Sequence, residues 1–415
     1  MSLRLLLCSF LVCLSMAGCN RQTVQESSTS VVPGVTEDEI LIGSSLALTG
    51  HAGYLGTQTL RGALAYLNRV NEEGGVHGRT IRVIAKDDGY DPPRCLVNTQ
   101  QLIIDENVFS LFCYVGTPTT VKILPLVQDA RIPLVGMFTG ANALREPFKP
   151  YVINVRPSYY QETGAAVRHL VEMGIHKIGI FYQYDAYGFD GLTGTELALQ
   201  DFGLEPEARG TYVRGTLDVE EGLRKIMDSE PEAVFMIGTY DPCAKFIKLA
   251  RAQGFNPIFY LVSFVGAEEL ARRLGSEQDG TIIMSQVVPP PESNEAGEII
   301  EMANSYTQDL EQYFPEDKPN FVGFEGYINA TVLVEGLRRA GRDLNRENFI
   351  KAIESIGNYS LGPNYTLSFS PTNHQGLERV FFTSLNNGRF ELITDWNAIR
   401  TRWATSRNTL SLFGE

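Results

Sequence analysis

The run Ile40-Leu41-Ile42-Gly43 and the segment 57–71 that follows it decide the fold of this chain. The run is short and apolar, which predicts a buried strand. In the segment, apolar residues recur at intervals of three and four positions: Leu60, Ala63, Leu64, Leu67 and Val70. Residues at that spacing lie on one face of a helix. A strand followed by such a helix is the unit that builds a parallel sheet.

The same alternation continues along the chain and then starts again. Further apolar runs predict strands at 81–84, 109–112, 133–136, 178–181, 233–236 and 259–262. Helical segments separate these runs, so the sheets are expected to be parallel and covered on both faces. We therefore predict an α/β protein with two lobes, each an open, mostly parallel sheet with helices on both faces.

Three stretches are suited to connect the lobes: 151–160, 282–291 and 362–369. Each contains proline, which is poorly tolerated in the interior of a sheet. Three crossings predict a three-strand hinge, an arrangement that lets two lobes close around a ligand. The first lobe is then expected to comprise 38–155 plus 288–364, and the second lobe 156–287 plus 365–415.

The N-terminus is expected to be removed rather than folded. Arg4 precedes the apolar run 5–14, which ends near small residues, and this pattern predicts a signal peptide over 1–18. The sequence Met16-Ala17-Gly18-Cys19 resembles a bacterial lipobox, which implies that Cys19 becomes the lipidated first residue. Residues 19–37 are then a lipid-anchored tether, and we expect the protein on the periplasmic face of a bacterial membrane.

The composition excludes several classes of protein. The 415 residues are 43% hydrophobic and 20% charged, as in globular domains, and the net charge of −14 argues against binding to nucleic acid. The five histidines are scattered without metal-ligand spacing, so no metal site is expected. The sequence contains neither glycine-rich nucleotide motifs nor a nucleophile–base constellation, which predicts a protein without a cofactor that is not an enzyme.

Three cysteines fall in the part expected to fold, namely Cys95, Cys113 and Cys243. In an oxidising compartment one pair of them can form a disulfide. Cys95 opens a predicted helix and Cys113 ends the next predicted strand. The sequence does not decide whether Cys95 and Cys113 form a disulfide, because strand order cannot fix the geometry of a bond. Cys243 is expected to be a small buried apolar residue.

Four loops follow predicted strands, and their ends are expected to meet at one edge of each sheet: 48–56, 116–120, 138–142 and 238–241. Thr117 and Thr119 are suited to cap the helix that follows their strand. A helix N-terminus offers free N–H groups and the positive end of the helix dipole, so a carboxylate is the natural ligand. The alternative is that these loops only cap helices.

Several motifs stand in a fixed order along the chain: 42–50, 71–78, 87–92, 116–120, 182–188 and 325–327. Through them the sequence from about Glu39 to Leu392 resembles the type I periplasmic solute-binding proteins of ABC importers, of the branched-chain amino acid, amide and urea class. The resemblance implies capture of a small solute between two lobes and its delivery to the permease subunits of an importer.

The resemblance also implies roles for individual residues. The serine that binds the ligand carboxylate corresponds to Thr117, and the next loop contributes Phe138, Thr139 and Gly140. From the second lobe, Tyr187 is expected to cover the ligand, and Thr239 and Tyr240 to face it. Tyr54 or its neighbour Leu55 corresponds to an aromatic cover on the first lobe.

One position departs from the amino-acid binders of that class. They place an acidic residue after the strand that corresponds to 259–262, to pair with the ligand ammonium, and here that residue is Ser263. Burying an ammonium without a counter-charge is costly. Asp241 or Asp185 is a substitute suggested by its position in a cleft loop. The ligand is therefore expected to be an amino acid or a related acid, with an amide, urea or aromatic acid as the alternative, and sensing with a separate membrane receptor as the alternative role.

Overall fold

The computed structural model of the protein describes residues 32–275, 280–291, 301–362 and 365–411. The expected signal peptide, Cys19 and the tether up to residue 31 lie outside these residues. Across the ranges just given, none of the helices combines the length and the apolar character needed to cross a membrane. The residues from Val32 onward form one compact unit.

The first sheet has five strands in the order β2-β1-β3-β4-β5, and every pairing in it is parallel. Its strands are β1 (Glu39–Leu46), β2 (Thr80–Asp87), β3 (Ser110–Phe112), β4 (Leu134–Val135) and β5 (Val152–Ile153). Along β3, Leu111 and Phe112 belong to two different apolar cores. Successive residues of a strand point to opposite faces, so each face of this sheet carries its own core.

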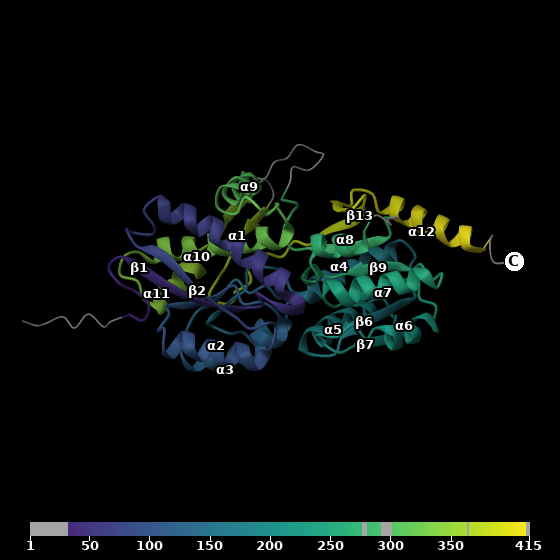
Figure 1. Cartoon of the computed structure of the whole chain (residues 1–415), viewed down its shortest axis with the longest axis horizontal. Helices are drawn as coiled ribbons and strands as arrows, with labels where there is room; N and C mark the ends of the chain where they lie inside the picture. The colour runs from purple at the N-terminus through teal and green to yellow at the C-terminus, as the bar shows by residue number, and fades with distance from the viewer. Residues whose placement is uncertain (1–31, 276–279, 292–300, 363–364, 412–415) are drawn as a thin grey trace, which may run out of the picture. The chain divides into compact units, whose positions relative to one another are not determined.

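Helices fill both faces of the first sheet (Figure 1). One face carries α1 (Gly53–Glu72) and α10 (Phe321–Ala340), and the other carries α2 (Pro92–Ile104) and α3 (Thr117–Asp129). The α1 and α10 backbones approach closely, because a Cβ atom on Gly62 would lie 1.8 Å from the Gly323 carbonyl oxygen. The remaining helices of this lobe are α9 (Glu301–Tyr313), α11 (Arg346–Glu354) and the short 3-10 helices η1 (Gly50–Ala52) and η2 (Asn142–Leu144).

The second sheet has seven strands in the order β14-β13-β10-β9-β8-β6-β7. Five of them are parallel: β6 (Ile178–Gln183), β7 (Ala208–Tyr212), β8 (Ala233–Ile237), β9 (Ile258–Leu261) and β10 (Ile282–Gln286). The hairpin of β13 (Phe381–Asn386) and β14 (Arg389–Leu392) adds two antiparallel strands. Asn387 and Gly388 form its turn with φ angles of 46° and 83°, as a two-residue hairpin requires.

The helices of the second lobe are α4 (Tyr159–Glu172), α5 (Ala186–Gln200), α6 (Glu220–Met227), α7 (Tyr240–Ala252), α8 (Ala267–Leu274) and α12 (Trp396–Ser411), with the 3-10 helix η3 (Ser263–Val265). Ser158 begins α4 with a reciprocal capping box to Gln161, and the Asp185 carboxylate caps α5. These caps fix the starting points of two helices that lead away from the ends of strands. The predicted α/β fold with mostly parallel sheets is therefore confirmed.

Three segments run between the two sheets. The first leads from β5 to α4, and the second leads from β10 towards α9. The third leaves the small two-stranded sheet of β11 (Tyr359–Gly362) and β12 (Tyr365–Leu367). The first and third segments are bonded to each other, since Asn154 N donates to His374 O at 2.8 Å and Leu377 N to Val155 O at 2.8 Å. Tyr365 OH donates to Val287 O at 3.2 Å and so connects the second segment.

The three cysteines of the fold are free and buried. Cys95 packs in the core between the first sheet and α2 and α3, whereas Cys113 belongs to the core on the opposite face. Asn329 Nδ2 of α10 lies 3.9 Å from Cys113 Sγ on that face. The Cys95–Cys113 disulfide left open by the sequence is therefore not formed, because the sheet lies between the two side chains.

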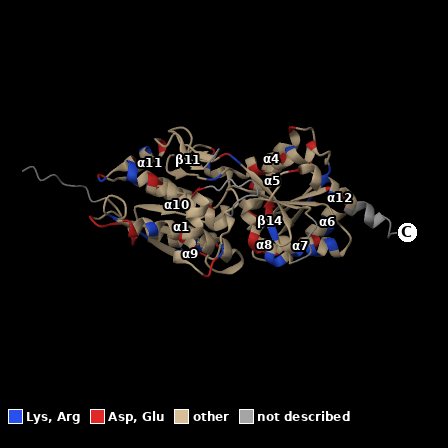
Figure 2. Cartoon of the chain, turned by 90° about the horizontal axis from the view of Figure 1, so that it is seen from above, with Lys and Arg blue, Asp and Glu red and all other residues tan. Residues whose placement is uncertain are grey.

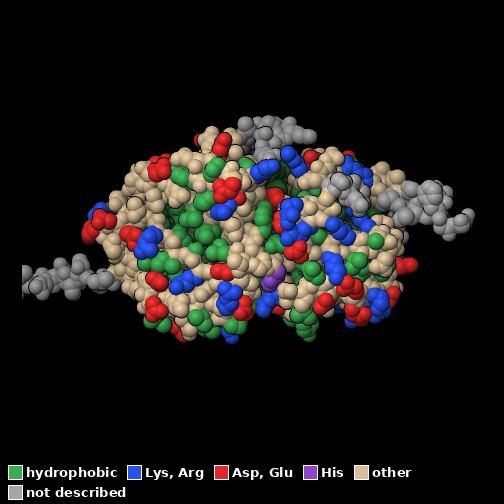
Figure 3. Space-filling view, in the orientation of Figure 1, with side chains coloured by type: hydrophobic (Ala, Val, Ile, Leu, Met, Phe, Trp, Pro, Cys, Tyr) green, Lys and Arg blue, Asp and Glu red, His purple; other side chains and the backbone are tan. Residues whose placement is uncertain are grey.

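Charged residues of both signs are spread along the ribbon (Figure 2), and Figure 3 shows their side chains mixed over one face of the molecule. On α8, for example, Glu269 pairs with Arg272 at 2.8 Å and also with Arg273.

Candidate ligand-binding site

Two threonine hydroxyls mark the site on the first lobe. Thr117 is the first residue of α3 after β3, and Thr139 follows β4. Their Oγ1 atoms are 2.7 Å apart and hydrogen-bonded, and both side chains are buried. The pair therefore lies at the positive end of a 13-residue helix, where an anion is stabilised.

The cap of α3 differs from the expectation. Gly116, not a threonine, is the N-cap, and its φ of 95° is one that glycine adopts without strain. Thr119 Oγ1 donates to the Val115 and Gly116 carbonyls at 2.6 and 2.9 Å, so this hydroxyl serves the turn. The prediction that Thr117 and Thr119 cap the helix was wrong, because a chain leaving a strand this sharply needs the left-handed conformation at residue 116.

Tyr187 and Thr239 lie at the starts of two second-lobe helices. Tyr187 is in the first turn of α5, and its hydroxyl donates to the Gly238 carbonyl at 3.0 Å. Thr239 is the N-cap of α7, and its backbone N–H donates to Tyr212 OH at 3.1 Å. Its Oγ1 is buried and has no hydrogen-bond partner among the described residues.

Five buried aromatic rings join these groups; we call them the aromatic cluster: Tyr90, Phe138, Tyr159, Tyr187 and Phe264. Phe264 lies among them, with ring centroids 4.7 Å from Tyr187, 5.6 Å from Phe138 and 5.8 Å from Tyr90. Tyr159 is 5.3 Å from Tyr187. Tyr90 and Phe138 follow strands of the first sheet, whereas Tyr187 and Phe264 follow strands of the second sheet. The cluster thus brings the two lobes together around Thr117 and Thr139.

Gly140 has a packing role in this arrangement. Its carbonyl accepts a hydrogen bond from Tyr159 N at 2.8 Å, and an added Cβ would lie 2.7 Å from that nitrogen. A glycine here therefore lets the Thr139 loop approach the start of α4.

Asp87 and Asp88 position the loops that carry the first-lobe residues. Asp87 accepts from Leu48 N at 2.9 Å and from Thr49 Oγ1 at 2.6 Å. Burial would raise the pKa of Asp87, but these and further hydrogen bonds outweigh it and lower the pKa to about 2. Asp88 accepts from Tyr90 N at 2.8 Å, and burial raises its pKa to about 6. Both aspartates therefore cap loops.

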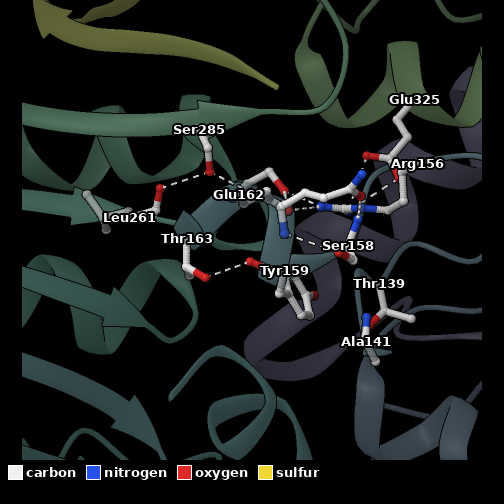
Figure 4. A network of polar contacts seen from close by, with 12 residues as sticks. Thr139, Ala141, Arg156, Ser158, Tyr159, Glu162, Thr163, Leu261, Ser285 and Glu325 are labelled. Atoms are coloured by element: carbon white, nitrogen blue, oxygen red, sulfur yellow. Dashed lines mark hydrogen bonds and ion pairs between the residues drawn. The ribbon is translucent and has the colours of Figure 1, made fainter. Parts of the chain in front are cut away.

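Ser263 belongs to a buried ionic network rather than to an open pocket wall, and Figure 4 shows Arg156, Glu162 and Glu325 of that network. Its backbone N–H and its Oγ donate to Glu162 at 2.8 and 3.0 Å, and its Oγ also contacts Arg156. Arg156 Nη2 donates to Glu162 at 2.9 Å, and Nη1 donates to both Glu325 oxygens at 3.3 Å. Arg156 comes from the first connecting segment, Glu162 from α4 and Glu325 from α10, so the network connects both lobes.

The same arginine contacts the aromatic cluster. The Arg156 guanidinium lies over the rings of Phe138 and Tyr159, at 5.3 and 5.6 Å from their centroids. Burial raises the pKa of Glu325 to about 7, against the opposing attraction of Arg156. The attraction of Glu325 and Glu162 outweighs burial at Arg156 and raises its pKa.

Tyr54, Tyr240 and Asp241 form a second group beside η3 and α8. The Tyr54 and Tyr240 rings meet edge to face at 6.2 Å, and Tyr54 OH donates to Glu268 at 3.3 Å. Asp241 pairs with Arg273, whose guanidinium lies 4.4 Å from the Tyr240 ring centroid. Asp185 likewise has a cation, Arg214, at 3.3 Å. Both carboxylates considered as partners for a ligand ammonium are thus already paired with arginine.

Four residues of this site were not predicted: Tyr90, Arg156, Tyr159 and Phe264. Tyr90 stands inside the motif 87–92 and Phe264 next to Ser263, so each adjoins a segment that the sequence did single out. The signal that could have identified Tyr90 and Phe264 is an aromatic residue in a loop that follows a predicted strand. Among the described residues, no group of three or more His, Cys, Asp or Glu side chains is arranged to bind a metal ion.

The fold and the site define a binding protein in which two lobes meet around a buried aromatic and hydroxyl-lined centre. Residues 39–389 match the family model described as "Periplasmic binding protein", and the chain belongs to this family. Its members are extracytoplasmic binding proteins rather than enzymes.

Curated relatives are similar over part of their length. An amino acid binding protein of Pseudomonas aeruginosa is 21% identical over 241 residues, covering 58% of this chain and 64% of its own. Leu/Ile/Val-binding protein homolog 7 of Brucella abortus is 21% identical over 229 residues, covering 53% of this chain and 57% of its own. The chain thus spans about 60% of the length of these curated relatives.

Solved structures match over nearly the whole fold. A structure described as a possible leucine/isoleucine/valine-binding protein from Rhodopirellula baltica SH 1 is 34% identical with a TM-score of 0.82, and the match covers 89% of this chain and 98% of that chain. A branched chain amino acid ABC transporter protein from Thermus thermophilus with bound valine has a TM-score of 0.76 and 19% identity, and the match covers 88% of this chain and 99% of that chain. The second likeness is one of fold alone.

Proposed function

We propose that this protein is the solute-binding subunit of an ABC importer and that it captures a small carboxylate-bearing solute, an amino acid or a related acid, between its lobes. The observation that carries the proposal is the buried Thr117–Thr139 hydroxyl pair at the N-terminus of α3. Hydroxyl donors and a helix N-terminus at one point suit a carboxylate. The family membership and the amino acid-binding relatives support the same solute class.

In this proposal the first lobe binds the carboxylate through Thr117 and Thr139, with Phe138 and Gly140 shaping the loop. Closure then adds the second-lobe residues Tyr187, Thr239 and Tyr240, with Tyr54 closing the rim. Ser263 and Asp241 act through their neighbours Glu162 and Arg273. Only the closed, loaded form docks on the permease, so ligand binding selects one conformation.

The test replaces the hydroxyl and keeps the shape. In the mature chain, Thr117→Val is expected to raise the Kd for a bound carboxylate by about tenfold to a hundredfold, since a hydrogen bond to a charged group contributes about 1.5–3 kcal/mol. The measurement is calorimetric titration with leucine, valine, phenylalanine and their deaminated acids. Thr331→Val is the matched control, because Thr331 is equally buried but donates within α10 to Tyr327 O at 3.0 Å. An unchanged Kd in Thr117→Val would remove Thr117 from the site.

We further propose that residues 1–18 are cleaved and that Cys19 is lipidated, so that residues 19–37 tether the protein to the periplasmic face of a membrane. The family places the folded part outside the cytoplasm, which supports an exported precursor. Cys19→Ala in the full chain is expected to abolish incorporation of labelled fatty acid and to move the protein from the membrane fraction to the soluble fraction. Labelling that persists in the variant would contradict the anchor.

A further inference from the structure

Three hydroxyls at the site are buried and without partners among the described residues: Tyr90 OH, Tyr159 OH and Thr239 Oγ1. Their residues are 1%, 0% and 1% exposed. Leaving a buried hydroxyl unpaired is unfavourable, and native proteins rarely do so without a functional reason. Three such groups around one aromatic cluster indicate hydrogen bonds that a ligand completes.

The three hydroxyls divide into two ends. Tyr159 N donates to the Gly140 carbonyl at 2.8 Å, so Tyr159 lies beside the Thr139 loop and belongs, with the Thr117–Thr139 pair, to the carboxylate end. The Tyr90 ring lies 5.7 Å from the guanidinium of Arg214, which pairs with Asp185 at 3.3 Å. Gln183 donates to Asp185 through Nε2 at 2.7 Å, and its Oε1 accepts from Tyr212 OH at 2.9 Å. Tyr212 OH in turn accepts from Thr239 N at 3.1 Å. Tyr90 OH and Thr239 Oγ1 are therefore at the same polar end, defined by Gln183 and Tyr212.

Aromatic rings lie between these two ends. Phe264 contacts the rings of Phe138, Tyr187 and Tyr90, all within 6 Å. Such rings pack favourably against a flat unsaturated body, face to edge or offset. The hydroxyls of Tyr90 and Thr239 can each donate and accept, so a hydroxyl group is a suitable partner for them.

Two guanidinium groups flank the cluster. Arg156 lies over Phe138 and Tyr159, and Arg214 lies 5.7 Å from the Tyr90 ring centroid. Each guanidinium is bonded to carboxylates, Arg156 to Glu162 and Glu325 and Arg214 to Asp185, so these carboxylates already have a cation partner. A ligand ammonium placed among these groups would have to share carboxylates that already pair with arginine, and burying an ammonium without a counter-charge of its own is costly.

We propose, building on the function proposed above, that the ligand is an aromatic carboxylic acid with a hydroxyl group at the end remote from the carboxylate and with no ammonium group. Tyr90 and Thr239 are the specificity-determining residues that bind the remote hydroxyl. The carboxylates beside the cluster are already paired with Arg156 and Arg214, which disfavours the amino acid that has the same skeleton.

The experiment compares ligands that differ by one group. Calorimetric titrations of the mature chain use 3-(4-hydroxyphenyl)propanoate, 3-phenylpropanoate, which lacks the hydroxyl, and L-tyrosine, which adds the ammonium. L-leucine and the shorter pair 4-hydroxybenzoate and benzoate complete the panel. In at least one pair the hydroxylated acid is expected to bind about tenfold more tightly than its parent, and L-tyrosine to bind at least tenfold more weakly than 3-(4-hydroxyphenyl)propanoate.

Variants test the residues. Tyr90→Phe and Thr239→Val are expected to remove the roughly tenfold advantage of the hydroxylated acid over its parent acid. Tyr114→Phe is the control, because Tyr114 is a fully buried tyrosine of the first lobe whose hydroxyl is bonded to Thr99 Oγ1 at 2.9 Å. It should retain the tenfold advantage.

The outcomes separate this inference from the proposed function. Binding of L-leucine or L-tyrosine in preference to the deaminated acids, with loss in Thr117→Val, would overturn the inference and leave the proposed function standing. Equal binding of both members of each acid pair, unaffected by Tyr90→Phe, would overturn the remote hydroxyl site. Failure of the folded chain to bind any acid of the panel would overturn both.

Discussion

At the scale of single residues, the least expected feature is that Ser263 does not stand in for an acid. Its hydroxyl and backbone N–H hold Glu162, and Glu162 pairs with Arg156 at 2.9 Å. The position therefore organises a buried arginine instead of presenting a charge to a ligand. The neighbouring Phe264, rather than Ser263, enters the aromatic cluster.

The Arg156 network predicts a pH-dependent stability. The pKa of Glu325 rises from its ordinary value of 4.5 to about 7, so the folded state binds more protons than the unfolded state between these values. The contribution of Glu325 to the free energy of unfolding therefore falls by about 3 kcal/mol at most as the pH rises from about 4.5 to about 7. Above that pH the contribution is constant. Glu325→Gln is expected to remove this part of the pH dependence.

Chemical denaturation of the wild type and Glu325→Gln at pH 5 and pH 7.5 measures the difference. The wild type should lose more stability between the two pH values than the variant does. Because Asp88 and Asp190 titrate equally in both proteins, they cancel in the comparison. Identical losses would show that Arg156 keeps Glu325 ionised throughout.

At the scale of elements, a carboxylate of the second lobe, Glu268, accepts a hydrogen bond from the N-terminus of α10. Asn320 caps the helix by accepting from Gly323 N at 2.7 Å. Glu268 of α8 then accepts from Phe321 N at 2.9 Å and from Tyr54 OH at 3.3 Å. A carboxylate at a helix N-terminus is stabilising, and the bonds to Phe321 N and Tyr54 OH form when the lobes are together.

Glu268→Gln is therefore expected to weaken ligand binding by about threefold to tenfold while changing the free energy of unfolding little. The reason is that the closed form becomes less populated without the Glu268 carboxylate. The apparent affinity is proportional to the fraction of molecules in the closed form, so it falls as well. Glu221→Gln in α6 is the control, because Glu221 is exposed and pairs with Arg224 of its own helix at 3.0 Å. Titration of both variants with the same ligand provides the readout. Equal affinities in the two variants would contradict a role of Glu268 in closure.

The elements were largely predictable, and the exceptions have local causes. The strands with continuous apolar runs, such as β8, were predicted because burial on both faces leaves a strong pattern. β7 (Ala208–Tyr212) was not, because an edge strand of the sheet carries only alternate buried residues. Thr117 and Thr139 were singled out by their place after predicted strands and by the family resemblance, although the predicted capping role of Thr117 was wrong. Which rings meet across the lobes could not be predicted, because Tyr90 and Phe264 are 174 positions apart and their contact depends on the lobe arrangement.

At the scale of the whole molecule, a second carboxylate joins the lobes. Asp190 of α5 accepts from Asn142 N of η2 at 2.9 Å. Burial raises the pKa of Asp190, whereas the hydrogen bond from Asn142 and the charge of Arg145 lower it. Burial is the larger effect, and the pKa rises from 3.8 to about 6. Closure thus removes a carboxylate from water at a net cost, even though a hydrogen bond forms.

The sign of the resulting pH effect follows from linkage. The closed form binds a proton on Asp190 more readily than a form in which this carboxyl faces water, so acidification from pH 7.5 to 5.5 favours closure. Ligand affinity is therefore expected to increase about threefold to tenfold over this range, as the free energy of closure becomes more favourable. Asp190→Asn keeps an oxygen for Asn142 N without the charge, so it should bind more tightly than the wild type at pH 7.5 and show little change towards pH 5.5. Ligand titrations of the wild type and of Asp190→Asn at pH 7.5 and pH 5.5 test this prediction. If the affinity of both proteins changed equally with pH, the titrating group would not be Asp190.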